Sequence, residues 1–350
     1  MTSNKTRSIK INTENLEPGM KVARDIENDS DGIFIPAKTI LNEEYITRIK
    51  ELNYKFIYIM IEKTASRVNI EKKKLIDKSY KKNTVKIKDL FNKVKRAKKI
   101  EYHEIKDLAV EANKLGNELD ILDLVNMIRT ADEYTYTHSL NVSILANMFA
   151  QWLNFDNKDK IRITLAGLLH DIGKAKIPDK ILNKPGSLSP EEFEEMKKHT
   201  IYGYEMLKDV KEIPAVVKKA VITHHEHFNG EGYPLELKSS KIPLFGRIIA
   251  IIDAFDAITA NRVYKSKNSP FQAMEIFVHE ETTHFDPALK EVFLAHLPNY
   301  FIKENVILND GRMGEIVFIN PVKPESPIIK VSDQYIDLTK EPGLKIKELF

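Results

Sequence analysis

Leu168-Leu169-His170-Asp171-Ile172-Gly173-Lys174 places a histidine and an aspartate side by side at the end of an apolar segment. The spacing of Ile163, Ala166 and Leu169 predicts a helix before the pair, and Gly173 is a natural place for that helix to stop. A buried ionisable pair is costly unless it is paired or bound to a metal ion. A lone His-Asp pair is more often a hydrogen bond that joins two helices, so the positions of the other histidines decide between these interpretations.

The composition is that of an ordinary globular protein. Of its 350 residues, 42% are hydrophobic and 30% are charged, which allows two or three domains with a substantial core. The formal net charge of +3 is too small to indicate a nucleic-acid polymer or a membrane as partner. The absence of cysteine excludes disulfides, iron–sulfur clusters and thiolate zinc sites. No leader sequence or membrane-spanning run is visible, so we expect a cytoplasmic protein.

Hydrophobic periodicity divides the chain into four segments. They are a small α+β regulatory or docking module (1–62), a helical connector (63–129), a helical segment that carries the chemistry (130–300) and a β-rich appendage (301–350). In the first segment Asn42 is expected to cap a helix, and in the last Asn309-Asp310-Gly311 is a hairpin turn signal. Strands are expected over 21–26, 32–36, 56–59, 306–308, 315–319, 328–331 and 335–338. The predicted fold class is mainly α, an all-α helical bundle core flanked by the two small β-containing modules.

Polar residues recur at the inner ends of the apolar stripes in residues 130–300. Ser189, Pro190 and Glu192 predict a capping box at the start of a helix that is expected to end at His199. His224 and His225 follow an apolar stripe formed by Val216, Val217, Ala220 and Val221, and Asp253 and Asp256 share a helix face. The polar groups expected to converge are His138, His170, Asp171, His199, His224, His225 and Asp253.

Taken singly, each of these residues has a structural explanation, because a histidine on an apolar face is usually a satisfied core residue. Seven polar groups in one all-α core would be costly without something to bind them. Imidazoles and carboxylates without thiolates suit Fe, Mn, Ni, Co or Zn. Seven ligands are too many for one tetrahedral ion and suit two ions that share a carboxylate, most simply Asp171.

The order of the motifs resembles that of the HD-GYP family, bacterial phosphodiesterases of cyclic di-GMP within the HD superfamily of metal-dependent phosphohydrolases. The motifs are Tyr134–Ser139, His170–Lys174, His199-Thr200, His224-His225-Glu226, Gly230–Pro234, Asp253–Thr259, Asn261–Lys265 and Thr283–Pro287. The resemblance covers about residues 130–295 and implies an HD-type bundle. A weaker likeness at Leu16–Met20 is to a module that often precedes such domains.

The resemblance also implies roles for individual residues. One metal ion would be held by His138, His170, Asp171 and Asp253, and the second by His199, His224 and His225 with Asp171 bridging. Asp171 and Lys174 would be catalytic, with Lys174 near the scissile phosphate. Arg262 and Lys265 would contact the substrate's phosphates, since a dianionic substrate needs cations beside a site rich in carboxylates. The implied cofactors are two divalent ions, with Fe or Mn favoured, and the loop Gly232-Tyr233-Pro234 is a candidate contact for substrate or a protein partner.

Three positions depart from the family's pattern. His227 stands where the family has arginine, and Asn229 stands where it has aspartate. These departures affect the expected geometry of the Gly-Tyr-Pro loop and its fit to the substrate or a partner. Members with three metal ions have a glutamate where this chain has Tyr134. We therefore expect two ions, with Asp256 supporting a ligand from behind.

The expected activity is metal-dependent hydrolysis of cyclic di-GMP to linear pGpG, with GMP as a further product. Three alternatives stay open: a phosphohydrolase of the superfamily that acts on another nucleotide, a hydrolase of a related cyclic dinucleotide, and a non-catalytic protein that senses or docks cyclic di-GMP. The sequence leaves the oligomeric state open.

Overall fold

The chain forms two compact units. The computed structural model describes residues 7–27, 33–61, 67–96, 101–119, 124, 134–259, 269–279 and 283–349. One unit comprises residues 1–73, 303–318 and 327–350, and the other comprises residues 74–302 and 319–326. Each unit is therefore built from segments that are not contiguous in sequence.

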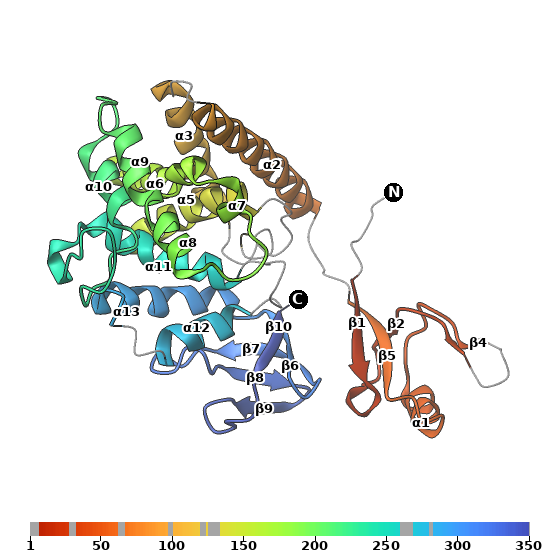
Figure 1. Ribbon diagram of the computed structural model, residues 1–350. Coiled ribbons are helices and arrows are strands. Elements are labelled where there is room, and N and C mark those ends of the chain that lie inside the picture. The colour runs from red at the N-terminus through yellow and green to blue at the C-terminus, as the bar shows by residue number, and fades with distance from the viewer. Residues whose placement is uncertain are drawn as a thin grey trace. The chain divides into compact units, whose positions relative to one another are not determined.

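The first unit combines the β-containing segments from both ends of the chain. Its N-terminal part has strands β1 (Arg7–Asn12), β2 (Lys21–Val22), β3 (Ile26–Glu27), β4 (Ile33–Ile35) and β5 (Phe56–Ile61) and helix α1 (Glu43–Glu51). Its C-terminal part has β6 (Asn305–Leu308), β7 (Met313–Phe318), β8 (Ile328–Val331), β9 (Gln334–Asp337) and β10 (Ile346–Leu349). The strands form antiparallel sheets of order β1-β5-β2, β3-β4 and β10-β6-β7-β8-β9 (Figure 1).

Contacts between the two parts explain why they form one unit. Ile307 of β6 packs in the apolar core of the N-terminal part, together with Ile11 and Ile59. The side-chain amide of Asn15 donates to the carbonyl of Asp310, 3.3 Å away. The four-segment division made from the sequence stays a prediction.

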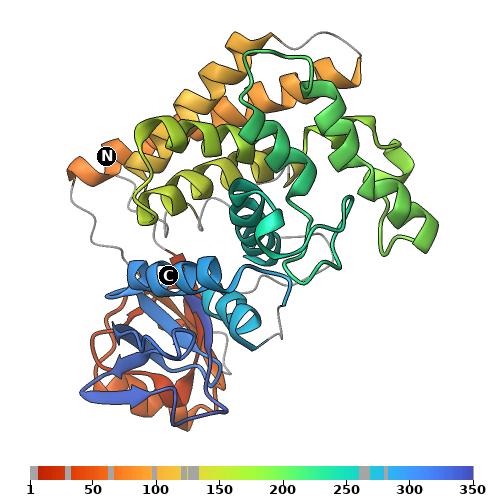
Figure 2. The same cartoon turned by 90° about the vertical axis from the view of Figure 1, so that its left-hand side faces the viewer.

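The second unit is a helical bundle (Figure 2). Its longer helices are α3 (Tyr102–Glu118), α5 (Tyr134–Trp152), α6 (Asn157–Leu169), α8 (Pro190–Lys197), α9 (His199–Leu207), α10 (Ala215–Thr223), α11 (Leu244–Thr259), α12 (Pro270–His279) and α13 (Pro287–His296), with most of α2 (Arg67–Lys95). The short segments η2 (Ile172–Lys176) and α7 (Asp179–Leu182) lie between α6 and α8. Helix α5 is central and packs against α3, α6 and α11, with apolar side chains such as Phe149 and Phe255 fully buried.

The structure confirms the mainly α fold class and corrects local details. The strand expected over 21–26 is two short strands, because β2 pairs with β5 while β3 pairs with β4. The capping box at Ser189 is present, with Glu192 as its reciprocal partner. The helix it begins ends at Lys197, so the expectation that it ends at His199 is wrong; His199 begins α9.

Among the described residues, no helix has both the length and the apolar character needed to cross a membrane.

Candidate metal centre

Helix ends deliver most of the polar side chains to one point in the second unit. His170 is the C-cap of α6, and His224 is the C-cap of α10. His199 follows directly after the C-terminal end of α8. The carboxyl end of a helix carries partial negative charge and unpaired carbonyl groups, which favour a cation nearby. Asp171 and His225 directly follow two of these histidines in the chain. His138 lies in the second turn of α5, and Asp253 and Asp256 lie on α11.

Each of these three histidines uses its Nδ1 atom to hold the end of a helix. The ring of His170 donates to the carbonyl of Gly167 at 2.7 Å, that of His199 to Met196 at 2.7 Å, and that of His224 to Val221 at 2.8 Å. A carbonyl oxygen can only accept, so the proton must sit on Nδ1 in each ring. In the neutral imidazoles the Nε2 lone pairs are therefore free to bind a metal ion.

The Nε2 atoms face one another in pairs. Those of His138 and His170 are 3.2 Å apart, and those of His199 and His224 are 3.4 Å apart. In His138 the Nδ1 atom lies 2.7 Å from Oδ2 of Asp256, so the Nε2 atom again carries the lone pair when Nδ1–H donates to the carboxylate. Lone pairs at this separation repel one another unless a cation lies between them.

Asp171 separates the two pairs of histidines. Its Oδ2 atom is 3.4 Å from Nε2 of His138 and of His170. Its Oδ1 atom is 3.4 Å from Nε2 of His199 and 3.9 Å from that of His224. The fully buried Oδ1 atom has no hydrogen-bond partner, although a buried carboxylate oxygen normally has one.

The potential metal ligands form two groups that share Asp171. One contains Asp171, His199, His224 and His225, and the other contains His138, His170 and Asp171; within each group one potential ligand atom per residue lies within 4.8 Å of all the others. An unpartnered carboxylate oxygen and facing imidazole lone pairs are what a metal site requires. The residues thus fit divalent metal ions of the kind that imidazole and carboxylate bind.

Burial keeps the imidazoles of His199, His224 and His225 neutral. Desolvation lowers the pKa of His199 to about 4 and that of His225 to about 3, and it lowers the pKa of His224 as well. For Asp171, desolvation opposes ionisation, but the charge of Lys174 and the interactions with His170 and His138 outweigh it and hold the pKa well below its usual value. Neutral imidazoles around an ionised carboxylate are the protonation states that bind metals.

Asp253 lies on the accessible side of the centre. Its Oδ1 atom is 3.0 Å from Nε2 of His138 and 3.9 Å from that of His170, and 17% of its side chain is exposed. Although burial opposes it, contacts with His138 and the nearby histidines lower the pKa of Asp253. Asp256 is completely buried on the same helix behind His138, the position expected of a residue that orients a ligand.

Lys174 places a cation at the edge of the centre. Its ammonium group lies 2.6 Å from Oδ2 of Asp171, and 24% of its side chain is exposed. Arg262 and Lys265, the other expected substrate contacts, fall outside the described residues, as does the side chain of Tyr134.

The loop Gly232-Tyr233-Pro234 lies against the second histidine group. The ring of Tyr233 stacks on that of His225 with centroids 4.9 Å apart. Glu226, which belongs to the motif His224-His225-Glu226 but had no predicted role, is buried and fixes this loop. Its carboxylate accepts from the backbone N–H of Leu235 at 2.6 Å and of Leu237 at 2.9 Å. Its place directly after the histidine pair was the only signal in the sequence.

The two departures in this loop make local contacts. The ring of His227 stacks on that of His284, with centroids 4.1 Å apart, and His227 belongs to neither ligand group. Asn229 donates to Oγ1 of Thr283 at 3.0 Å and accepts from the backbone N–H of Glu231 at 3.0 Å. Both residues therefore attach the loop to the segment before α13.

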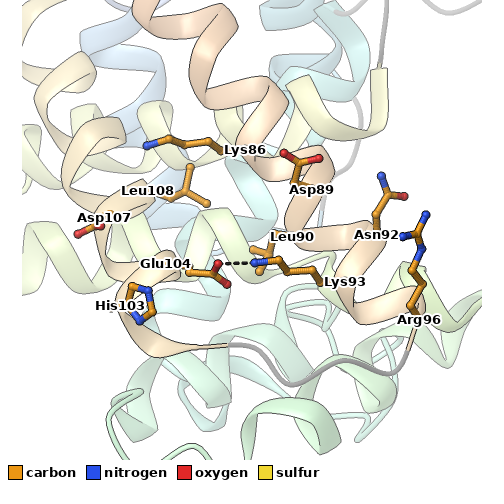
Figure 3. A pocket seen from close by; sticks show the side chains of 10 residues that line it. All are labelled: Lys86, Asp89, Leu90, Asn92, Lys93, Arg96, His103, Glu104, Asp107 and Leu108. Carbon is orange, nitrogen blue, oxygen red and sulfur yellow. Dashed lines mark hydrogen bonds and ion pairs between the residues drawn. The ribbon is translucent and has the colours of Figure 1, made fainter.

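A separate hollow of about 520 Å³ lies between α2 and α3 (Figure 3). The ion pair between Lys93 and Glu104 crosses it. Its other charged lining residues include Lys86, Arg96, Asp89 and Asp107, so the lining favours neither anions nor cations.

Comparisons with known proteins agree with this geometry. A family model described as "HD domain" matches residues 123–289. Residues 123–289 are an HD domain. The HD domain holds every potential ligand named above, and HD domains bind divalent metal ions.

Relatives of this HD domain confirm the resemblance to HD-GYP proteins. A cyclic di-GMP phosphodiesterase of Pseudomonas aeruginosa is 36% identical over 222 residues, which are 63% of this chain and 53% of the relative. One of Thermotoga maritima is 37% identical over 177 residues, 50% of this chain and 48% of the relative. A 3′3′-cGAMP-specific phosphodiesterase of Vibrio cholerae is 36% identical over 191 residues, 54% of this chain and 36% of the relative. The chain thus spans about half, or less, of the length of these relatives.

A solved structure supports the fold. The structure of "Bd1817, a HDG"Y"P protein from Bdellovibrio bacteriovorus" matches with a TM-score of 0.53 at 19% identity, covering 82% of this chain and 98% of the other. At this identity the match concerns the fold alone.

Proposed function

We propose that this chain is a cyclic di-GMP phosphodiesterase with a binuclear metal centre in its HD domain. The observation that carries the proposal is the pair of ligand groups joined through the two oxygens of Asp171. The identity to relatives named as cyclic di-GMP phosphodiesterases supports the choice of substrate. Hydrolysis would add water across one P–O bond of the ring and give linear pGpG, which the same chemistry can cut to GMP.

We assign one ion to His138, His170, Asp171 and Asp253, and the other to Asp171, His199, His224 and His225. Iron or manganese suits this set of imidazoles and carboxylates without thiolates. Bound there, the ions would supply Lewis acidity and lower the pKa of water to about 7. The cytoplasm is the compartment in which a cyclic dinucleotide messenger would meet this enzyme.

The protein's own residues would bind and orient the substrate. The Lys174 ammonium group, held by Asp171, would donate a hydrogen bond to a non-bridging phosphate oxygen and stabilise the charge that builds there. Asp253 is ionised and partly exposed, so it can accept a hydrogen bond from a water molecule and orient it at the centre. Arg262 and Lys265 are proposed to contact the phosphates, and the loop Gly232-Tyr233-Pro234 to contact substrate or a protein partner.

A related cyclic dinucleotide is the second candidate substrate. It is favoured by the similarity to a phosphodiesterase specific for 3′3′-cGAMP, at 36% identity. The non-catalytic alternative is disfavoured because six of the seven expected ligands lie in the two potential ligand groups, and the seventh, Asp253, lies 3.0 Å from Nε2 of His138.

The test is hydrolysis of cyclic di-GMP and of 3′3′-cGAMP by protein purified without oxygen, with the metal content of the same sample measured. We expect about two ions per chain and pGpG or GMP as product, and loss of both metal and turnover in His170→Ala. Two ions without turnover of either dinucleotide would contradict the proposed substrate, and full turnover in His170→Ala would contradict the metal mechanism.

A further inference from the structure

Phe193 is an exposed aromatic residue joined to the metal centre through a second ring. It lies on α8 and is 49% exposed. Its ring meets that of Tyr233 edge to face, with centroids 6.5 Å apart and planes at 81°. Tyr233 in turn stacks on His225, one of the potential ligands. An isolated exposed phenylalanine is common on protein surfaces. This one is connected to the centre, because it contacts Tyr233 and Tyr233 contacts the potential ligand His225.

Lys197 holds the two rings from one turn further along α8. Its ammonium group is 5.5 Å from the ring centroid of Phe193 and 5.7 Å from that of Tyr233. It also forms an ion pair of 2.5 Å with Glu194, and only 26% of its side chain is exposed. Cation–π contacts of this kind orient aromatic rings. Phe193 is thus a positioned ring with much of its surface open to solvent.

Resting on the function proposed above, we propose that Phe193 is a base-stacking residue for the nucleotide substrate, with Tyr233 and Lys197 as the residues that position it. The ring centroid of Tyr233 is 4.9 Å from that of His225, and the centroid of Phe193 is 6.5 Å from that of Tyr233. The ring of Phe193 is therefore within reach of a base whose phosphate lies at the metal centre. A solvent-exposed aromatic face beside a phosphate site is the arrangement by which proteins bind single nucleotides through stacking.

The chemistry of Phe193 sets a limit on the selectivity of this contact. Phenylalanine has no hydrogen-bonding group in its side chain, and stacking tolerates any base because every base has a π-face. Phe193 would therefore strengthen binding of guanine and adenine alike. It follows that the contact supplies affinity and leaves the choice between cyclic di-GMP and 3′3′-cGAMP to other residues.

Steady-state kinetics on the full chain test this assignment. We expect Phe193→Ala and Phe193→Leu to raise KM for cyclic di-GMP about tenfold, with little change in kcat and an unchanged metal content. Phe193→Tyr should keep KM within about twofold of the original protein, because it keeps the ring. The matched control is Phe318→Ala, which removes a ring that is 51% exposed on β7 and should leave KM unchanged. An unchanged KM in Phe193→Ala, or a Leu variant equal to the Tyr variant, would overturn the assignment.

A binding measurement separates this inference from the proposed function. The chain has one tryptophan, so the emission added by Phe193→Trp is read by difference from the original protein. We expect GMP to quench it and ribose 5-phosphate, which has no base, to leave it unchanged. Quenching by GMP in a protein that hydrolyses no cyclic dinucleotide would support stacking while contradicting the proposed function. Hydrolysis with no effect of GMP on the added emission would contradict stacking alone.

Discussion

Replacing Gly173 by alanine should disrupt the centre without touching a ligand. A Cβ atom at this position would lie 1.9 Å from the carbonyl oxygen of His199 and 2.5 Å from the backbone nitrogen of Gly203. Both neighbours are backbone atoms of α9 and cannot rotate away. Ordinary van der Waals contact with a Cβ atom begins at 3.4 Å, so η2 and α9 must separate by roughly 1.5 Å.

This separation has two measurable consequences. Overpacking of this kind costs about 3 kcal/mol of folding free energy, which would appear as a lower midpoint of urea unfolding. Asp171 and His199 lie on opposite sides of the contact, and ligands must be held within about 0.5 Å of their working geometry. We therefore expect the variant to lose most of its metal as well.

The assay is urea unfolding followed by circular dichroism, with the metal content of the same preparation measured. Gly343→Ala is the control, because a Cβ atom there meets no heavy atom within 4 Å. A Gly173→Ala variant within about 0.5 kcal/mol of the original protein, with its metal intact, would refute this account of the packing between η2 and α9.

Three further changes probe other parts of the structure. Ser189→Ala removes the N-cap of α8 and should cost about 1 kcal/mol in urea unfolding, while an altered metal content would show that α8 does more than carry the site. Asp256→Asn leaves the fold in place but removes the carboxylate that fixes the ring of His138, so metal affinity, measured by competition with a chelator, should fall about 10- to 100-fold; unchanged affinity would contradict this role. After metal is removed, the free energy of unfolding should fall as the pH is lowered from 6.5 towards 4, because His199 has a folded pKa of about 4 against 6.5 and binds its proton only on unfolding. The loss is roughly 3 kcal/mol, and His199→Gln should flatten this part of the pH profile; an equally steep profile in that variant would contradict the assignment.

Many of the helices could be predicted because their signals are local. The capping box at Ser189 and the Asn42 cap depend on residues three positions apart, and both are present. The polar residues at the ends of apolar stripes were found for a similar reason, since each stripe marks the buried face of its own helix. The stripes identify those residues but do not show which of them meet; the grouping into two sets came only from the family resemblance.

Other features have no local signal. The partners of the Nδ1 atoms in His170, His199 and His224 are carbonyl groups three residues earlier, which any amino acid supplies. The break between α8 and α9 at Lys198 occurs without a proline or glycine, so no helix-breaking residue marks it in the sequence.

The strands show the same limit. β1 and β10 were not predicted, because a strand at the end of a chain is defined by its partner. β1 pairs with β5, about 50 positions along the chain, and β10 pairs with β6, about 40 positions earlier. The union of the N- and C-terminal parts depends on contacts such as that between Asn15 and Asp310, which no local pattern predicts.

The central claim is that two metal ions share Asp171. Anomalous X-ray diffraction from crystals of the protein grown with Mn²⁺ or Fe²⁺ tests it most directly, because the method locates each ion. The account predicts two anomalous peaks in the HD domain, one beside Oδ2 of Asp171 among His138 and His170, and one beside Oδ1 among His199 and His224. A single peak, or two peaks that do not share Asp171, would contradict it.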